Sequence, residues 1–319
     1  MISLRQSLSA AASSANRLLL LSRQRRSIST SLTKSKSSIG TLRVQGPDAA
    51  GIVAACTQLL GQSGNILKSE SWTCPLHHQF FQRIVFSYPK ESFPKHEKLK
   101  LEQELQYIAS HFRLDAELNW RSQPPRVGIL VSKYDHCLWE LLKAQELDME
   151  IPLIISNHNE CRPIADQFDI PYHLLPITPD TKAEQEAKQL KLLAENKVDV
   201  VVLARYMQVL SENFLQQFPN RIINIHHSFL PAFMGGRPYH GAYERGVKLI
   251  GATAHYATLD LDDGPIIEQD ITQVSHRDSI RDMMRKGRIL ERNVLLRALE
   301  AHLDDRVLVY KNKCVVFGD

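Results

Sequence analysis

Three side chains suited to acyl chemistry lie in the second half of the chain. Asn224 and His226 end an apolar run, and Asp262 follows in a loop. Residues two apart on a strand share a face, so Asn224 and His226 would project together. An amide and an imidazole can each donate a hydrogen bond to an oxyanion developing on a carbonyl. A carboxylate nearby could position water or hold the imidazole in its charged form, so the pattern indicates a site for a small acyl group.

Each of these residues also has a purely structural interpretation. Asn224 could cap a loop, His226 could be a hydrogen-bonded core histidine, and Asp262 could only shape the turn before Gly264-Pro265. For any one of them alone the structural interpretation is favoured, and the three together are more specific. Asp263 is interpreted as a solvated loop acid that could share the work of Asp262.

The surrounding pattern alternates strands and helices, which predicts a Rossmann-like α/β domain with a mostly parallel sheet covered on both faces. The predicted strands are 127–132, 152–156, 198–203, 221–226, 248–256 and 266–270, and the predicted helices are 138–146, 160–168, 181–196 and 211–218. Ligands of such sheets bind at the carboxyl ends of the strands, where Asn224 and His226 would stand.

The segment before this domain has the order βαββαβ, which predicts a ferredoxin-like fold. Its elements are expected at 39–44, 49–60, 65–73, 79–87, 94–111 and 116–118. The turn from Gly46 to Val53 resembles the start of an ACT domain, a small regulatory module that often binds amino acids and pairs edge to edge. The resemblance implies an amino-acid effector at Asp48, Gly51 and Ile52 and a homo-oligomer, although the turn could merely begin a helix.

The expected organisation has four parts: a transit peptide at 1–37, the ACT-like domain at 38–120, a polar, proline-bearing linker at 121–126 and a catalytic domain at 127–319. The first 47 residues contain no Asp or Glu, and the 39 basic residues of the chain include seven in the first 36. This composition, with helical spacing of apolar residues, predicts a mitochondrial protein, or alternatively a plastid one; a disordered basic tail is the simpler alternative.

Several partner classes are disfavoured. Without those seven residues 32 basic residues face 35 acidic ones, a net charge near −3 that argues against nucleic acid. No apolar run approaches the roughly 20 residues that cross a bilayer, so no membrane partner is expected. The five cysteines form no C-x-x-C pair, no His-Glu-x-x-His is present, and adjacent His226 and His227 would face opposite ways. We therefore expect no metal.

Two longer motifs carry a resemblance to a known family. Asn-x-His-x-Ser-x-Leu-Pro at 224–231 and Leu-Asp-x-Gly-Pro-Ile-Ile at 261–267 are similar to the formyltransferases that use formyl-tetrahydrofolate. Residues 130–137, 154–158 and 251–256, together with the preceding ACT-like segment, resemble the formyltetrahydrofolate deformylases over about residues 40–317.

The resemblance implies hydrolysis of 10-formyltetrahydrofolate to formate and tetrahydrofolate, within one-carbon and purine-linked metabolism, with no cofactor beyond the folate substrate. It implies that Asp262 activates water while Asn224 and His226 stabilise the oxyanion. The residues that it places around the pterin are Arg205, Tyr206, Met207, Val209, Leu210, Thr258 and Leu261. Two departures are a shorter stretch at 138–149 and Met234 where a lysine is expected.

Three alternatives remain open at this point. A transferase acting on glycinamide ribonucleotide would need a glycine-rich phosphate cradle after the first strand, and 132–136 has no glycine, although Lys133 could hold an anion. A transfer-RNA formylating enzyme would be expected to carry a further basic domain. An inactive folate- or amino-acid-binding regulator would not need the intact Asn224, His226 and Asp262.

Overall fold

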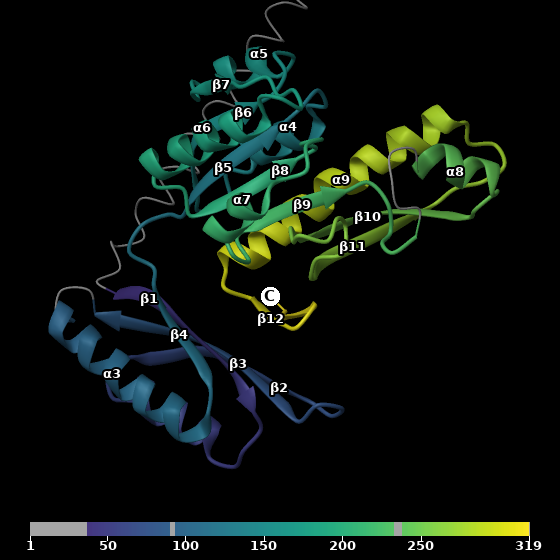
Figure 1. Cartoon of the computed structure of the whole chain (residues 1–319). Helices are drawn as coiled ribbons and strands as arrows, with labels where there is room; N and C mark the ends of the chain where they lie inside the picture. The colour runs from purple at the N-terminus through teal and green to yellow at the C-terminus, as the bar shows by residue number, and fades with distance from the viewer. Residues whose placement is uncertain (1–36, 90–92, 233–237, 319) are drawn as a thin grey trace, which may run out of the picture.

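The computed structural model describes residues 37–89, 93–232 and 238–318, which form two sheets with their helices and a C-terminal hairpin (Figure 1). The expected transit segment lies outside these ranges except for its last residue. In the described parts of the chain no helix combines the length and apolar character needed to span a membrane.

The N-terminal sheet confirms the ferredoxin-like prediction. Its strands are antiparallel in the order β2-β3-β1-β4. The elements are β1 (Ser37–Pro47), α2 (Ile52–Gly61), β2 (Asn65–Cys74), β3 (Gln79–Pro89), α3 (Lys95–Phe112) and β4 (Asp115–Trp120). Alternate β3 side chains such as Phe80, Ile84 and Phe86 pack in one core with Ile52 and Leu105 of the two helices. The period-two pattern of β3 thus buries one face of the sheet beneath both helices.

The opposite face of this sheet packs against the end of the chain. Phe81 of β3 forms a small core with Leu308 and Phe317. Leu308 lies in β12 (Val307–Tyr310), which pairs with β13 (Lys313–Val316) in a hairpin, and Phe317 directly follows β13. Figure 1 shows this hairpin between the two sheets. The C-terminal hairpin therefore joins the N-terminal unit to the rest of the molecule.

The second sheet has seven strands in the order β11-β10-β9-β8-β5-β6-β7. The strands are β5 (Arg126–Val131), β6 (Glu150–Ser156), β7 (Tyr172–Leu174), β8 (Val200–Ala204), β9 (Ile222–His226), β10 (Leu249–Tyr256) and β11 (Ile266–Gln273). The helices are α4 (His136–Lys143), α5 (Arg162–Gln167), α6 (Lys182–Glu195), α7 (Glu212–Gln217), α8 (Pro238–Glu244) and α9 (Ile280–Leu303). Strands β5 to β9 are mutually parallel, and β10 is antiparallel to both of its neighbours, β9 and β11. The prediction of a mostly parallel sheet is confirmed.

Helices cover both faces of this sheet. One core joins β5 and β9 to α4, α5 and α9, and the other joins the opposite faces of β5 and β8 to α6 and α7. The chain runs from β5 outward to β6 and β7, then returns to β8 on the other side of β5. The carboxyl ends of β5 and β8 consequently flank the topological switch point, where open α/β sheets bind ligands.

Helix α9 is the largest element that the sequence analysis missed; β7, α8, β12 and β13 are the others. Its start carries a capping box, in which the Ser279 side chain accepts a hydrogen bond from the Asp282 amide and the Asp282 carboxylate accepts one from the Ser279 amide. Val294, Leu295 and Leu299 bury its inner face against the sheet.

We predict that Leu299→Ala will lower the free energy of unfolding by about 2–5 kcal/mol, because Leu299 is fully buried and truncation leaves a cavity. Chemical denaturation followed by circular dichroism measures the change. The matched control is Ile289→Ala on the same helix, where the side chain is 46% exposed and the change should stay within about 0.5 kcal/mol. Equal losses in the two variants would contradict the packing of α9 on the sheet.

Candidate active site

The expected chemical residues meet at the carboxyl edge of β9. His226 is its last residue, and Asp262 reaches it from the loop between β10 and β11. His226 Nδ1 lies 3.1 Å from Asp262 Oδ1, and both side chains are largely buried. The hydrogen bond from His226 holds the pKa of Asp262 below its ordinary value, against a smaller opposing effect of burial. The pair is therefore an ionised carboxylate that orients the imidazole of His226.

The other ring nitrogen of His226 is left for a ligand by the residues that the structure describes. Nε2 is buried and makes no hydrogen bond among the described residues. A buried polar atom without a partner is costly, and at such sites it commonly marks where a ligand binds. With Nδ1 turned toward Asp262, Nε2 is the atom of His226 that can hydrogen-bond a substrate oxygen.

Asn224 is held by His255, a residue that the sequence analysis did not single out. The two lie opposite each other in the β9–β10 register, and Asn224 Nδ2 is 3.1 Å from His255 Nε2. His255 Nδ1 is 3.0 Å from the carbonyl of Tyr256, so Nδ1 carries the proton and Nε2 accepts from Asn224. Burial lowers the pKa of His255, which agrees with a neutral ring. Asn224 keeps its second amide hydrogen for a substrate.

The loop that carries Asp262 depends on two backbone features. Asp262 has φ +58°, a left-handed conformation that Asp tolerates better than most residues. A Cβ at Gly264 would stand 1.8 Å from the carbonyl oxygen of Tyr256, so only glycine fits there. The Thr258 hydroxyl donates to the carbonyl of Asp260 and closes the start of the loop. These features direct the loop back toward β9, so that Asp262 lies beside His226.

The structure separates the residues that the resemblance places around the pterin. Met207 and Val209 are about half exposed after β8, and Leu261 is exposed beside Asp262. Thr258 is partly buried in the same loop as Leu261.

Three others in that set turn inward. Tyr206 is buried in the α6–α7 core, where its hydroxyl accepts a hydrogen bond from Gln189, and Leu210 packs in the same cluster. Arg205 is buried and extends toward Glu291 of α9. Met207, Val209, Thr258 and Leu261 are therefore the members with side-chain surface for a substrate.

His227 lies between the catalytic candidates and a second group of polar side chains. Its ring is 4.9 Å from that of His226 and 6.2 Å from that of Tyr239, centroid to centroid. Burial, with the charges of Arg205 and His226, lowers the pKa of His227 to about 3. His227 is therefore neutral at physiological pH.

The second group, which we call the Glu291 cluster, comprises His136, Arg205, Tyr239 and Glu291. The Glu291 carboxylate is 2.8 Å from His136 Nε2 and 3.3 Å from Arg205 Nε, and it accepts a hydrogen bond of 2.9 Å from the Tyr239 hydroxyl. Burial alone would raise the pKa of Glu291, but the bond from His136 and the charge of Arg205 outweigh it, so this pKa is lowered. Glu291 therefore remains ionised although it is buried.

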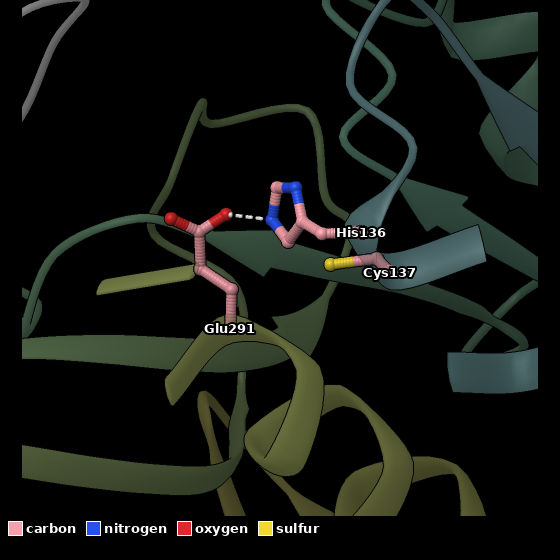
Figure 2. Close-up of side chains that lie close together, drawn as sticks. All are labelled: His136, Cys137 and Glu291. Atoms are coloured by element: carbon pink, nitrogen blue, oxygen red, sulfur yellow. Dashed lines mark hydrogen bonds and ion pairs between the residues drawn. The ribbon is translucent and has the colours of Figure 1, made fainter. Parts of the chain in front are cut away.

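Figure 2 shows His136 and Glu291 with Cys137 beside them, a group whose ligand atoms lie within 4.8 Å of one another. This spacing would admit a metal, but the chemistry opposes it. Both Glu291 oxygens are already engaged, the Arg205 guanidinium would face the cation, and burial raises the pKa of the Cys137 thiol well above its usual value. A thiol must lose its proton to bind zinc, so the group fits a metal poorly.

The expected effector residues lie at the start of α2. Asp48 and Gly51 are exposed, whereas the Ile52 side chain is buried in the core. Gly51 caps the helix with φ +98°, a conformation that favours glycine. No side chain caps this helix and its first turn has no acid, so its amide groups are open to an anion. Met234 lies outside the described residues.

Comparison with known proteins gives a consistent result. The sequence model described as formyl transferase matches residues 125–299. A formyltetrahydrofolate deformylase of Synechocystis sp. is 50% identical over 282 residues, which cover 87% of this chain and 98% of that protein.

Solved structures agree with the sequence match. The crystal structure of a formyltetrahydrofolate deformylase from Pseudomonas syringae pv. tomato superposes with a TM-score of 0.84 at 41% identity, covering 93% of this chain and 99% of the other. The glycinamide ribonucleotide transformylase 1 of Symbiobacterium toebii is more distant, with a TM-score of 0.59, 27% identity and coverage of 62% of this chain and 97% of that one.

The mitochondrial or plastid location expected from the N-terminal composition is wrong. The similar proteins come from bacteria, among them Synechocystis, Bacillus subtilis, Mycobacterium and Escherichia coli, which contradicts an organellar assignment. An acid-free, serine-rich opening is a compositional signal and does not establish import by itself.

We predict that buried His227 weakens the fold in acid. Its folded pKa of about 3 lies below the ordinary value of 6.5, so the stability contributed by the neutral ring is complete above about pH 6.5 and is lost as pH falls toward 3. In His227→Gln, denaturation curves between pH 7 and pH 4 should show a smaller decline in unfolding free energy than in the unaltered protein. Exposed His240→Gln is the control, and equal declines in all three proteins would refute this role for His227.

Proposed function

The chain belongs to the formyltetrahydrofolate deformylases of the formyl transferase family, and on this premise we propose that it hydrolyses 10-formyltetrahydrofolate to formate and tetrahydrofolate. The activity belongs to one-carbon metabolism. Transfer to glycinamide ribonucleotide and an inactive regulator are not favoured, because the relatives at 44–50% identity over most of the chain are named deformylases.

Among the described residues, His226 Nε2 has no hydrogen-bond partner and Asn224 Nδ2 bonds only His255; these two free donor positions on one strand face carry the mechanism. In the proposed reaction, the water oxygen attacks the formyl carbon and the carbonyl oxygen becomes an oxyanion. His226 Nε2–H and Asn224 Nδ2–H donate to it. The C–N10 bond then breaks, N10 takes a proton, and formate leaves with the oxygen from water.

Asp262 is proposed to serve both the imidazole and the water. Its Oδ1 faces His226, while Oδ2 makes no hydrogen bond to the described residues. A carboxylate with a lowered pKa is a weak base. We therefore assign Asp262 first to orienting the water and the His226 imidazole, and only then to taking a proton.

The proposed reaction uses no metal. Support comes from the oxyanion donors, which are protein groups, and from the occupied ligand atoms of the Glu291 cluster. The folate is then the only small molecule that the chemical step requires, as the sequence analysis expects.

The formate assay tests this function directly. We predict that Asp262→Asn will lower formate release from 10-formyltetrahydrofolate, measured without an acceptor and with EDTA present, by about a thousandfold or more. The matched control is Asp263→Asn, which removes the neighbouring exposed carboxylate and should change the rate by less than about threefold. Formate release that requires glycinamide ribonucleotide would identify a transferase, and loss in EDTA would overturn the metal-free mechanism.

The N-terminal unit, residues 38–120, is proposed as an ACT-type regulatory domain that binds an amino acid at the start of α2. The open amide groups of α2 would receive its carboxylate. Pairing into a homo-oligomer is proposed through the edge strand β2, where Leu67 and Trp72 are about half exposed.

Arg83 of this unit and Arg121, which directly follows it, provide a route to the catalytic domain. Arg83 Nη2 donates to the carbonyl of Asp304, and Arg121 Nη2 donates to the carbonyl of Leu303, at the end of α9. Positive charge at a helix C-terminus is stabilising, and the same helix carries Glu291. A movement of the N-terminal sheet on effector binding would therefore be passed through α9 to the active site.

We predict that one of the common amino acids will raise the melting temperature by several degrees and change the rate of formate release, because ligand binding to the folded state stabilises it. Arg121→Gln should retain the thermal shift but lose most of the rate change, since its contact with α9 is weakened. Differential scanning fluorimetry and the formate assay measure the two effects. The absence of both responses across all twenty amino acids would refute the effector site.

A further inference from the structure

Open α/β sheets bind ligands at the switch point, which in this sheet lies between the carboxyl ends of β5 and β8. Tyr134 and His136 follow β5, Arg205 follows β8, and Glu291 reaches them from α9. Arg205 and Glu291 are 8% and 2% exposed. The place where many α/β enzymes bind a ligand therefore carries a buried arginine and a buried glutamate in this chain.

Arg205 is held in an unfavourable backbone conformation. Its φ is +62°, a region that side chains larger than glycine rarely adopt. The guanidinium lies 5.6 Å from the centroid of the Tyr134 ring, and Nε lies 3.3 Å from Glu291 Oε2. Such a conformation persists only where surrounding contacts hold it. The ion pair with Glu291 and the Tyr134 ring are the contacts that surround the buried guanidinium.

The packing of α9 and α8 supports the same arrangement. A Cβ at Gly287 would come within 1.9 Å of the Tyr239 hydroxyl, so glycine on α9 leaves room for Tyr239. Tyr239 can then donate its hydrogen bond to Glu291. Its other neighbour is His227, whose ring stacks edge-on against His226. The Glu291 cluster is thus one residue away from the histidine that would bind the formyl oxygen.

We propose that Arg205, held by Glu291, fills the space that a formyl acceptor would need and thereby limits the acceptor to water. The inference rests on the proposed deformylase function and adds a specificity-determining residue to it. Water needs little space to reach the formyl carbon. An amine carrying a side group needs the volume that the guanidinium occupies, and a protonated amine is repelled by its charge. The transformylase that shares this fold is named for a second substrate.

Removing the Arg205 side chain would open a second reaction at the same centre. The amine nitrogen attacks the formyl carbon, the C–N10 bond breaks, N10 takes a proton, and the amine nitrogen loses one. The products are tetrahydrofolate and an N-formyl amine. Hydrolysis continues in parallel and gives formate, so the ratio of N-formyl amine to formate reports which acceptor the site admits.

The experiment uses the full chain with 10-formyltetrahydrofolate and glycinamide or hydroxylamine as the acceptor. Formate and N-formyl product are measured together by mass spectrometry. Arg205→Gly suits the positive φ and removes the side chain, so we expect the N-formyl to formate ratio to rise at least about tenfold over the unaltered protein. The matched control is Arg297→Gln, which removes an exposed α9 arginine that pairs with Glu268 and Asp270 and should leave the ratio unchanged.

Glu291→Gln is a second test variant, which leaves the Arg205 side chain intact. The amide keeps the shape of the carboxylate but loses the charge that holds the guanidinium, so the ratio should rise by a smaller factor. If Arg205→Gly fails to fold, as judged by circular dichroism, the product ratio of Glu291→Gln tests the inference. Ratios equal to that of the unaltered protein in every folded variant would overturn the inference. Absence of formate release from the unaltered protein would instead overturn the proposed function.

Discussion

The arrangement of the active site depends on the contact between Asp262 and His226. The two residues come from a strand end and a loop, and they meet only because β10 runs back along β9 and the loop returns at Gly264. The same antiparallel register sets His255 opposite Asn224. A single strand pairing therefore fixes the positions of four polar side chains, each within hydrogen-bonding distance of another.

The elements that could be predicted are those whose burial is periodic. Strand β9 reads as an apolar run in which Asn224 and His226 share a face, and the β–α alternation gives the parallel sheet directly. The pairing of Asp262 with His226 followed from family motifs and from the rule that ligands gather at strand ends. His255 lay within a stretch already noted for its resemblance, and its facing position opposite Asn224 was the signal that could have identified it.

Other features depend on tertiary contacts that the sequence does not display. Helix α9 has a capping box at Ser279, but its apolar positions are interrupted by charged residues such as Arg288 and Glu291. Glu291 has a charged side chain, which sequence alone would place at the surface. It is buried because its carboxylate pairs with His136, Arg205 and Tyr239 from three other segments. The family motif implies that Arg205 lines the pterin site, and the motif gave no sign that its side chain pairs with Glu291.

Three histidines stand close together near the end of β9, and their surroundings give them different roles. His226 has a carboxylate 3.1 Å from Nδ1, whereas His227 and His255 are buried without one as close. Burial lowers the pKa of both, and Arg205 adds to the effect at His227. The two neighbours of His226 are thus kept neutral, and His226 alone of the three has a carboxylate close enough to orient its ring toward a developing oxyanion. The residue that restricts the acceptor also helps to keep His227 uncharged, so specificity and protonation depend on the same buried guanidinium.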